Sequence, residues 1–186
     1  MKLKDLVKNA AVYLGLEKVV SYIESGAYSS DSNALYSTDA LTRCANLVVN
    51  ELACTYFPME KTEEIITEDG KAYYSSFTET PLEIKSVKSL NGEKADFTVY
   101  PEYIKTYESA VIIGYEYLPP NYDLNDTVGY KEKEIPARVI AYGVAAEYSL
   151  TVKAFDESVM FRDRYEKALE KIVAPKNAVA KGRVFI

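Results

Sequence analysis

The chain has 186 residues, enough for one domain that buries a core without stabilisation by disulfides or metals. Its composition, 48% hydrophobic and 27% charged residues, is ordinary for a folded protein. Histidine is absent, which removes the commonest general base and the commonest metal ligand. The net charge of −6 disfavours a nucleic-acid-binding protein with a basic face, and no apolar run approaches the ~18 residues of a membrane span.

Two short helices are predicted for residues 1–24. Apolar residues recur at helical spacing from Leu3 to Leu14, and Gly15 follows where a left-handed residue ends many helices. The second helix continues to Glu24. Residues 25–33 contain mainly Ser, Gly, Asp and Asn, a composition typical of a loop.

A longer helix is predicted for residues 38–57, with Ser37 or Thr38 as its cap and Asp39 in its first turn. Pro58 ends this helix, whose roughly 20 residues would span about 30 Å. Its apolar stripe consists of Leu41, Ala45, Val48, Leu52 and Tyr56.

Both cysteines, Cys44 and Cys54, fall on this helix. A rise of about 1.5 Å per residue separates them by about 15 Å, beyond disulfide reach. We therefore expect free thiols, buried in apolar surroundings, in a reducing compartment. The N-terminal residues lack the apolar core of a signal peptide, so we expect the protein to be made and kept in a cytoplasm.

From about residue 61 to residue 118 the apolar pattern changes to a period of two, which predicts an antiparallel β block. A strand over residues 62–67 is followed by a turn at Asp69-Gly70 and a return through residues 71–77. Further on, Asn91-Gly92 predicts a hairpin with a type I′ turn, because these two residue types tolerate the positive φ angles that the turn requires.

The two arms of this hairpin differ in regularity. Residues 81–90 form the first arm, in which Ile84 and Val87 are out of phase, and this predicts a β-bulge. The second arm alternates cleanly and predicts a half-buried strand with Ala95, Phe97 and Val99 on one face. The last strand, residues 110–117, begins apolar on both faces, so we expect it to be central in its sheet or covered by a helix.

Two helices close the pattern after a stiff loop over residues 119–126. The helix over residues 136–152 starts with Pro136 at its first position and is apolar nearly all round, which predicts burial on most sides. The helix over residues 156–174 places ion pairs at i, i+4 on its outer face. Its inward residues are Phe161, Tyr165, Ala168, Leu169 and Ile172, and its ion pairs are Arg162–Glu166 and Asp163–Lys167.

These elements predict an α+β protein in which N-terminal and C-terminal helix pairs form a bundle and the antiparallel β block is inserted between them. We expect residues 1–174 to form a single domain and residues 175–186 an extended C-terminal arm. This arm is expected to be ordered only against a neighbouring subunit or partner. Its docking residues would be Lys176, Lys181, Arg183, Val184, Phe185 and Ile186.

No set of residues predicts catalysis, a cofactor site or a metal site. Glu63 and Glu64 could suggest paired carboxylates, but neighbours in a strand point to opposite faces, so solvated charge on an edge strand is the favoured reading. The 17 tyrosines, with no tryptophan, favour interfaces over chemistry, because tyrosine covers much area at low entropic cost.

The order of elements resembles the head–tail connector, or adaptor, proteins of long-tailed bacteriophages. The resemblance lies in the layout of residues 41–58, 81–92, 111–120 and 135–172, and in the tail that contains Lys181-Gly182-Arg183. The long β block departs from a simple helical adaptor.

This resemblance implies a structural virion protein that is assembled in the host cytoplasm, has no enzymatic activity and touches no membrane. Such proteins form a ring of about twelve copies below the portal, bind the portal and a downstream neck or tail protein, and let DNA pass non-specifically through a channel. Residues 61–130 carry a net charge of −7, and an acidic wall would keep DNA phosphates from sticking. Another neck or tail-completion ring protein and a cytosolic non-enzymatic binding module stay open as alternatives.

Overall fold

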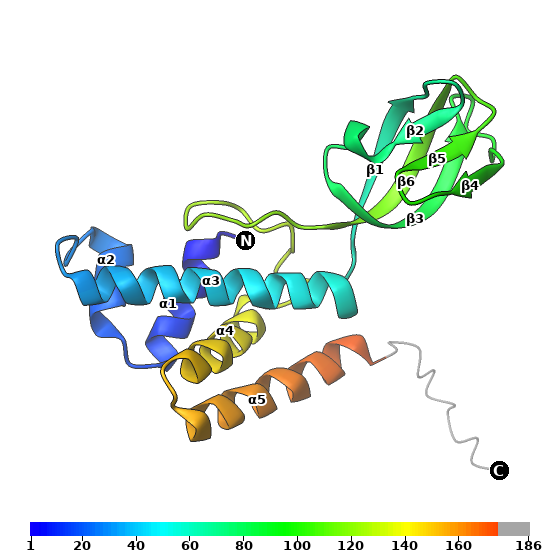
Figure 1. The fold of residues 1–186 in the computed structure, drawn as a ribbon. Helices are drawn as coiled ribbons and strands as arrows, with labels where there is room; N and C mark the ends of the chain where they lie inside the picture. The colour runs from blue at the N-terminus through cyan, green and yellow to red at the C-terminus, as the bar shows by residue number, and fades with distance from the viewer. Residues whose placement is uncertain (175–186) are drawn as a thin grey trace, which may run out of the picture. The chain divides into compact units, whose positions relative to one another are not determined.

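The computed structural model describes residues 1–174, which form a mixed α+β protein with five α-helices and two three-stranded antiparallel sheets (Figure 1). The predicted α+β class is therefore confirmed. The chain divides into two compact units, one made of Met1–Ala45 with the chain from Leu124 onward, and the other of Asn46–Asp123. That residues 1–174 behave as a single domain stays a prediction, and the arm over residues 175–186 lies outside the described residues.

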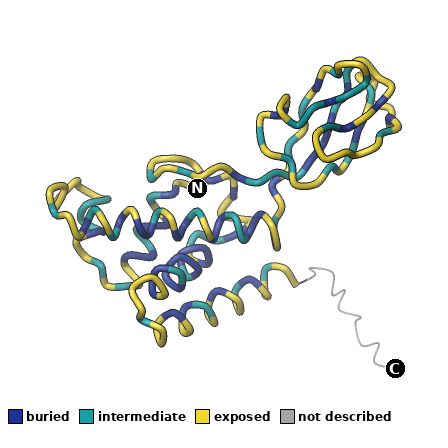
Figure 2. Tube along the Cα trace, in the orientation of Figure 1, coloured by how far each residue is buried: buried dark blue, intermediate teal, exposed yellow. Residues whose placement is uncertain are grey.

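The first unit, the helical unit, is organised around one buried helix. The helices are α1 (Leu3–Tyr13), α2 (Glu17–Ser25), the N-terminal part of α3 (Ser32–Thr55), α4 (Ala137–Thr151) and α5 (Phe155–Val173). Helix α4 packs against both α1 and α5, and most of its length is buried (Figure 2). This confirms the prediction from its small and apolar residues, with Pro136 as the cap and not the first helical residue.

Aromatic contacts join the helices around α4. The ring of Tyr13 from α1 stacks on Tyr142 from α4, with centroids 5.0 Å apart, and lies 6.5 Å from the ring of Phe161 on α5. The hydroxyl of Tyr148 donates a hydrogen bond of 3.2 Å to Ser37 on α3. The predicted ion pairs on α5 are present, and its buried residues Phe161, Tyr165 and Leu169 lie on the predicted face.

Helix α3 begins six residues earlier than predicted, at Ser32 instead of residue 38. Its cap is the Asp31 carboxylate, which accepts hydrogen bonds from the backbone N–H groups of Asn33 (2.9 Å) and Ala34 (3.1 Å). Thr38 lies inside the helix, where its hydroxyl bonds back to the Ala34 carbonyl at 2.8 Å. The loop-like composition of residues 25–33 concealed the start, because residues favoured in loops are also favoured as caps.

The predicted apolar stripe on α3 is buried as expected, except for its last residue. Leu41, Ala45, Val48 and Leu52 are buried, whereas Tyr56 lies beyond the last helical residue and is exposed. Both cysteines are free thiols, as predicted. Cys44 is buried, which raises the pKa of its thiol to about 11, but Cys54 is exposed and its predicted burial was wrong.

The second unit contains both sheets and is called the β unit. One sheet has the order β1 (Met59–Ile66), β6 (Ala110–Leu118), β3 (Thr80–Ser89), and the other has the order β2 (Lys71–Tyr73), β5 (Tyr103–Thr106), β4 (Phe97–Val99). The central place of β6 was predicted from its apolar start. The expected bulge in β3 is confirmed by register shifts at Pro81/Glu83 and Ile84/Ser86. The core of this unit consists of Ile65, Ala72, Phe77, Val87, Ala95, Ile104, Val111, Ile113 and Tyr115.

Asp69 and Gly70 have φ angles of 52° and 72°, so the predicted turn is present. The strands beside it nevertheless belong to different sheets, because β1 pairs with β6 and β2 pairs with β5. Glu68 and Lys71 close the turn through backbone hydrogen bonds of 2.9 Å in both directions. The turn therefore passes the chain from one sheet to the other.

The type I′ turn predicted at Asn91-Gly92 was wrong. Only Gly92 has a positive φ, 85°, and its N–H donates to the Ser89 carbonyl at 2.9 Å. Leu90 and Asn91 are thus the central residues of the turn, and a left-handed glycine follows them. The hairpin is also short, since β3 pairs along its length with β6 and β4 pairs with β5. Val99, expected to be half buried, is exposed.

A pair of glycines at turns gives a stability test. Both Gly70 and Gly92 have positive φ, but a Cβ on Gly70 would lie 2.5 Å from the Thr106 backbone oxygen, whereas a Cβ on Gly92 meets nothing within 4 Å. Gly92→Ala should lower the free energy of unfolding by about 1 kcal/mol, the cost of the left-handed conformation. Gly70→Ala should cost about 1–3 kcal/mol more, because the backbone must move. Urea denaturation measures both, and equal losses would contradict the close approach.

Candidate interaction surfaces

None of the predicted docking residues in the arm, from Lys176 to Ile186, is among the residues that the structure describes. Their role stays a prediction. Within residues 1–174, no three His, Cys, Asp or Glu side chains gather in a way that could hold a metal ion. No helix in that part of the chain is long and apolar enough to cross a membrane.

Glu63 and Glu64 lie on opposite faces of the edge strand β1, as predicted, and do not form a carboxylate pair. Glu64 is exposed, but Glu63 is half-buried, contrary to the expectation of two solvated charges. The ammonium of Lys61 lies 2.8 Å from one carboxylate oxygen of Glu63, and the N–H of Thr78 donates to the other at 3.0 Å.

These contacts set the charge state of the Glu63 carboxyl. Burial works to raise its pKa, but the hydrogen bonds from Lys61 and Thr78 outweigh burial and hold the pKa at about 2. Burial raises the pKa of the neighbouring Tyr115 to about 12, and the Glu63 charge adds to that rise. Glu63 therefore acts as a structural anion that ties β1 to the segment before β3.

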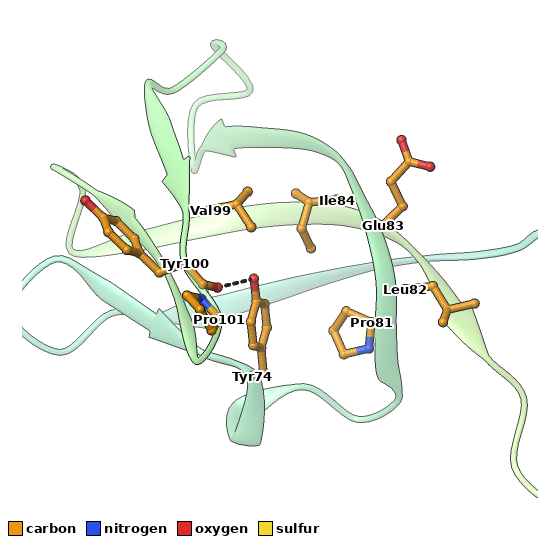
Figure 3. A pocket seen from close by; sticks show the side chains of 8 residues that line it. All are labelled: Tyr74, Pro81, Leu82, Glu83, Ile84, Val99, Tyr100 and Pro101. Atoms are coloured by element: carbon orange, nitrogen blue, oxygen red, sulfur yellow. Dashed lines mark hydrogen bonds between the residues drawn. The ribbon is translucent and has the colours of Figure 1, made fainter.

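A groove of about 620 Å³ opens on the β unit between β3 and the end of β4 (Figure 3). Figure 3 shows residues of β3 on one side and Val99, Tyr100 and Pro101 on the other, with Tyr74 below. The Tyr74 hydroxyl donates to the Tyr100 carbonyl at 3.0 Å and fixes that wall. The full lining is Tyr74, Pro81, Leu82, Glu83, Ile84, Val99, Tyr100 and Pro101, residues that are apolar or aromatic apart from Glu83.

The groove forms where two neighbouring strands separate. Near the turn, Lys88 bridges to Lys94, and the Ala95 N–H donates to the Val87 carbonyl at 3.0 Å. If this antiparallel register continued, Leu82 would lie opposite Tyr100. Across the described part of the chain, however, no hydrogen bond joins residues 81–84 to residues 99–101, because β4 turns to pair with β5.

The helical unit presents a second candidate surface, where α4 ends and α5 begins. Leu150, Val152, Phe155 and Val159 are between 47% and 70% exposed although they fall within ten positions of the chain. Phe155 and Val159 share one face of α5 because they are four residues apart. We call these four residues the α4–α5 apolar surface. Contiguous exposed apolar patches are typical of interaction sites, and the nearness of these four residues in the chain makes this connection a candidate for one.

Sequence reasoning found neither surface. The prolines and tyrosines of the groove are visible in the sequence, but they belong to three separate segments that only the sheet pairing brings together. The α4–α5 apolar surface had a weak signal, since Val152 and Phe155 interrupt the polar residues expected at the connection between two helices.

Replacing Glu63 should give a pH-dependent loss of stability. A folded pKa of about 2, below the ordinary 4.5, means that the carboxylate stabilises the fold above pH 4.5 and that this contribution disappears as the pH falls toward 2. Glu63→Gln should therefore lower the free energy of unfolding by about 1 kcal/mol at pH 7 and by progressively less below pH 4.5. Urea denaturation across this range checks it.

Glu64→Gln is the matched control, on the same strand but with an exposed side chain. It should leave stability unchanged at each pH. An equal loss for Glu63→Gln at pH 7 and near pH 2 would show that the effect is not the ionised contact with Lys61 and Thr78.

Comparison with known proteins does not place this chain in a family: no protein-family model matches it, and a search of curated proteins returns no match.

Proposed function

We propose that this chain is a non-enzymatic structural protein that assembles into a ring and serves as an adaptor in the neck of a tailed bacteriophage. In this role it joins the portal to a downstream neck or tail protein around the DNA channel. The proposal combines the element order that resembles head–tail connectors with the presence of an exposed apolar surface on the helical unit.

The α4–α5 apolar surface carries the proposal. Fully burying a Val, Leu or Phe side chain contributes roughly 1.5–3 kcal/mol, so four such residues could supply much of the free energy of a subunit contact. In a cyclic ring each subunit uses one surface against a different surface of its neighbour, and the contact repeats until the ring closes. A single connection between two helices can supply such a contact without any catalytic group.

The negative charge of the β unit suits a position beside a channel through which DNA slides. Asn46–Asp123 contains 6 Lys against 14 Asp and Glu, a net charge of −8. A wall of this sign repels phosphate and so disfavours sticking.

A cytosolic non-enzymatic binding module is the second candidate function. The groove on the β unit favours it, because an apolar cleft between strands can bind a peptide without any ring. The two candidates differ in the self-association that they require.

Native mass spectrometry of the full chain, alone and with portal protein, tests the ring. We expect a closed oligomer of about twelve copies with at least one of these samples. The double variant Phe155→Glu, Val159→Glu should weaken association at least tenfold, because charges would replace apolar side chains in the contact.

Tyr107→Glu is the control, since Tyr107 is 90% exposed and belongs to the β unit and not to the α4–α5 apolar surface. It should leave the oligomer intact. A chain that stays monomeric both alone and with portal would exclude the ring and favour the binding module.

A further inference from the structure

We propose that the groove between β3 and β4 binds residues 181–186 of a second copy of this chain as an added β-strand. The proposal rests on the proposed function in one respect: it names a second contact between neighbouring copies in the ring, beside the α4–α5 apolar surface. The occupant is argued from the backbone geometry of the groove, its side chains and its charge.

The first argument is the unused edge of β4. The N–H of Tyr100 donates to the Tyr103 carbonyl at 2.9 Å, so these two residues form a hydrogen-bonded pair in the ladder with β5. Because orientation alternates along an antiparallel strand, the N–H and C=O of Val99 then point away from β5, toward β3. On the other side of the groove, β3 is the edge strand of its own sheet. An extended segment between them finds backbone partners on both walls.

The second argument is the character of the walls. Leu82 is 49% exposed and Val99 is 53% exposed, one on each side of the groove. Open strand edges with exposed apolar side chains invite strand addition, and natural proteins usually block such edges. Pro81 and Pro101 remove backbone donors only at one end of the groove, which leaves the backbone groups of Ile84 and Val99 to bond there, while those of Glu83 face β6.

The third argument is complementarity of charge and shape. Glu83 lines the groove with its carboxylate paired to Lys85 at 3.0 Å, and the groove belongs to a unit with a net charge of −8, so a basic and apolar segment suits it. Residues 181–186 read Lys-Gly-Arg-Val-Phe-Ile, which combines two positive charges with three residues of high β propensity. As a strand, this segment would place Val184 and Ile186 on one face and Arg183 and Phe185 on the other.

The ring supplies the reason for a second copy. Each subunit would give one segment to a neighbour and receive one, so that a weak contact is repeated around the ring and becomes strong in sum.

A peptide of residues 176–186, labelled with a fluorophore, is the probe. Fluorescence anisotropy with the full-length protein should show saturable binding below about 1 mM. Hydrogen exchange should slow at Ile84 and Val99 when the peptide is added, because these amides gain partners. Val99→Lys should weaken peptide binding at least tenfold, through lost apolar contact and like charge.

Two controls separate strand addition from general attraction. Ile66→Lys adds the same charge to an exposed position of the β unit that does not line the groove, and it should change binding less than twofold. The peptide variant Lys181→Glu, Arg183→Glu should bind at least tenfold more weakly. No saturable binding, equal weakening by the two lysine variants, or protection outside the groove would overturn the proposal.

Self-association of the full chain checks whether the segment comes from a second copy. Val99→Lys should lower the self-association of the full chain, measured by native mass spectrometry, together with its peptide affinity. If the chain forms a ring that Val99→Lys leaves unchanged, this inference fails and the proposed function stands. If the peptide binds but the full chain never associates, the assignment to a second copy is overturned together with the ring.

Discussion

A reciprocal hydrogen-bond pair fixes the base of the β unit. The side-chain amide of Asn46 donates to the Tyr122 carbonyl at 2.9 Å, and its oxygen accepts from the Tyr122 N–H at 2.8 Å. Asn46 lies within α3, and Tyr122 lies on the chain that returns from β6. One side chain therefore satisfies both backbone groups of a residue 76 positions away and holds the outgoing and returning segments together.

Above this base, the strands of the β unit divide between two central strands. The long strands β1 and β3 both pair with β6, which is central and apolar, while the short strands β2 and β4 pair with β5. Strand β4 pairs with β5 through one edge and turns away from β3, so the hairpin at Asn91-Gly92 closes near its turn and opens beyond it. The groove forms where the hairpin opens. The hydrogen bond from the Tyr74 hydroxyl to the Tyr100 carbonyl fixes one of its walls.

Both proposed contacts use residues that the fold leaves uncovered, and they come from different units. The helical unit offers side chains at a connection between helices, whereas the β unit offers backbone groups on a strand edge. These contacts differ in chemistry: apolar burial has little directionality, and a β-ladder fixes register. A ring that used both would gain affinity from the first and geometry from the second.

Local signals in the sequence determined the α+β class, the buried character of α4, the ion pairs on α5, the left-handed turn at Gly70 and the bulge in β3. Each depends on residues close together in the chain. The start of α3 was missed because Asp31 is a loop residue and a cap at once, and the turn at Gly92 was misassigned because its form depends on which strands pair. Only the tertiary structure decided those pairings, since strand order is set by contacts between residues far apart in sequence, where many alternative partners have similar local propensity.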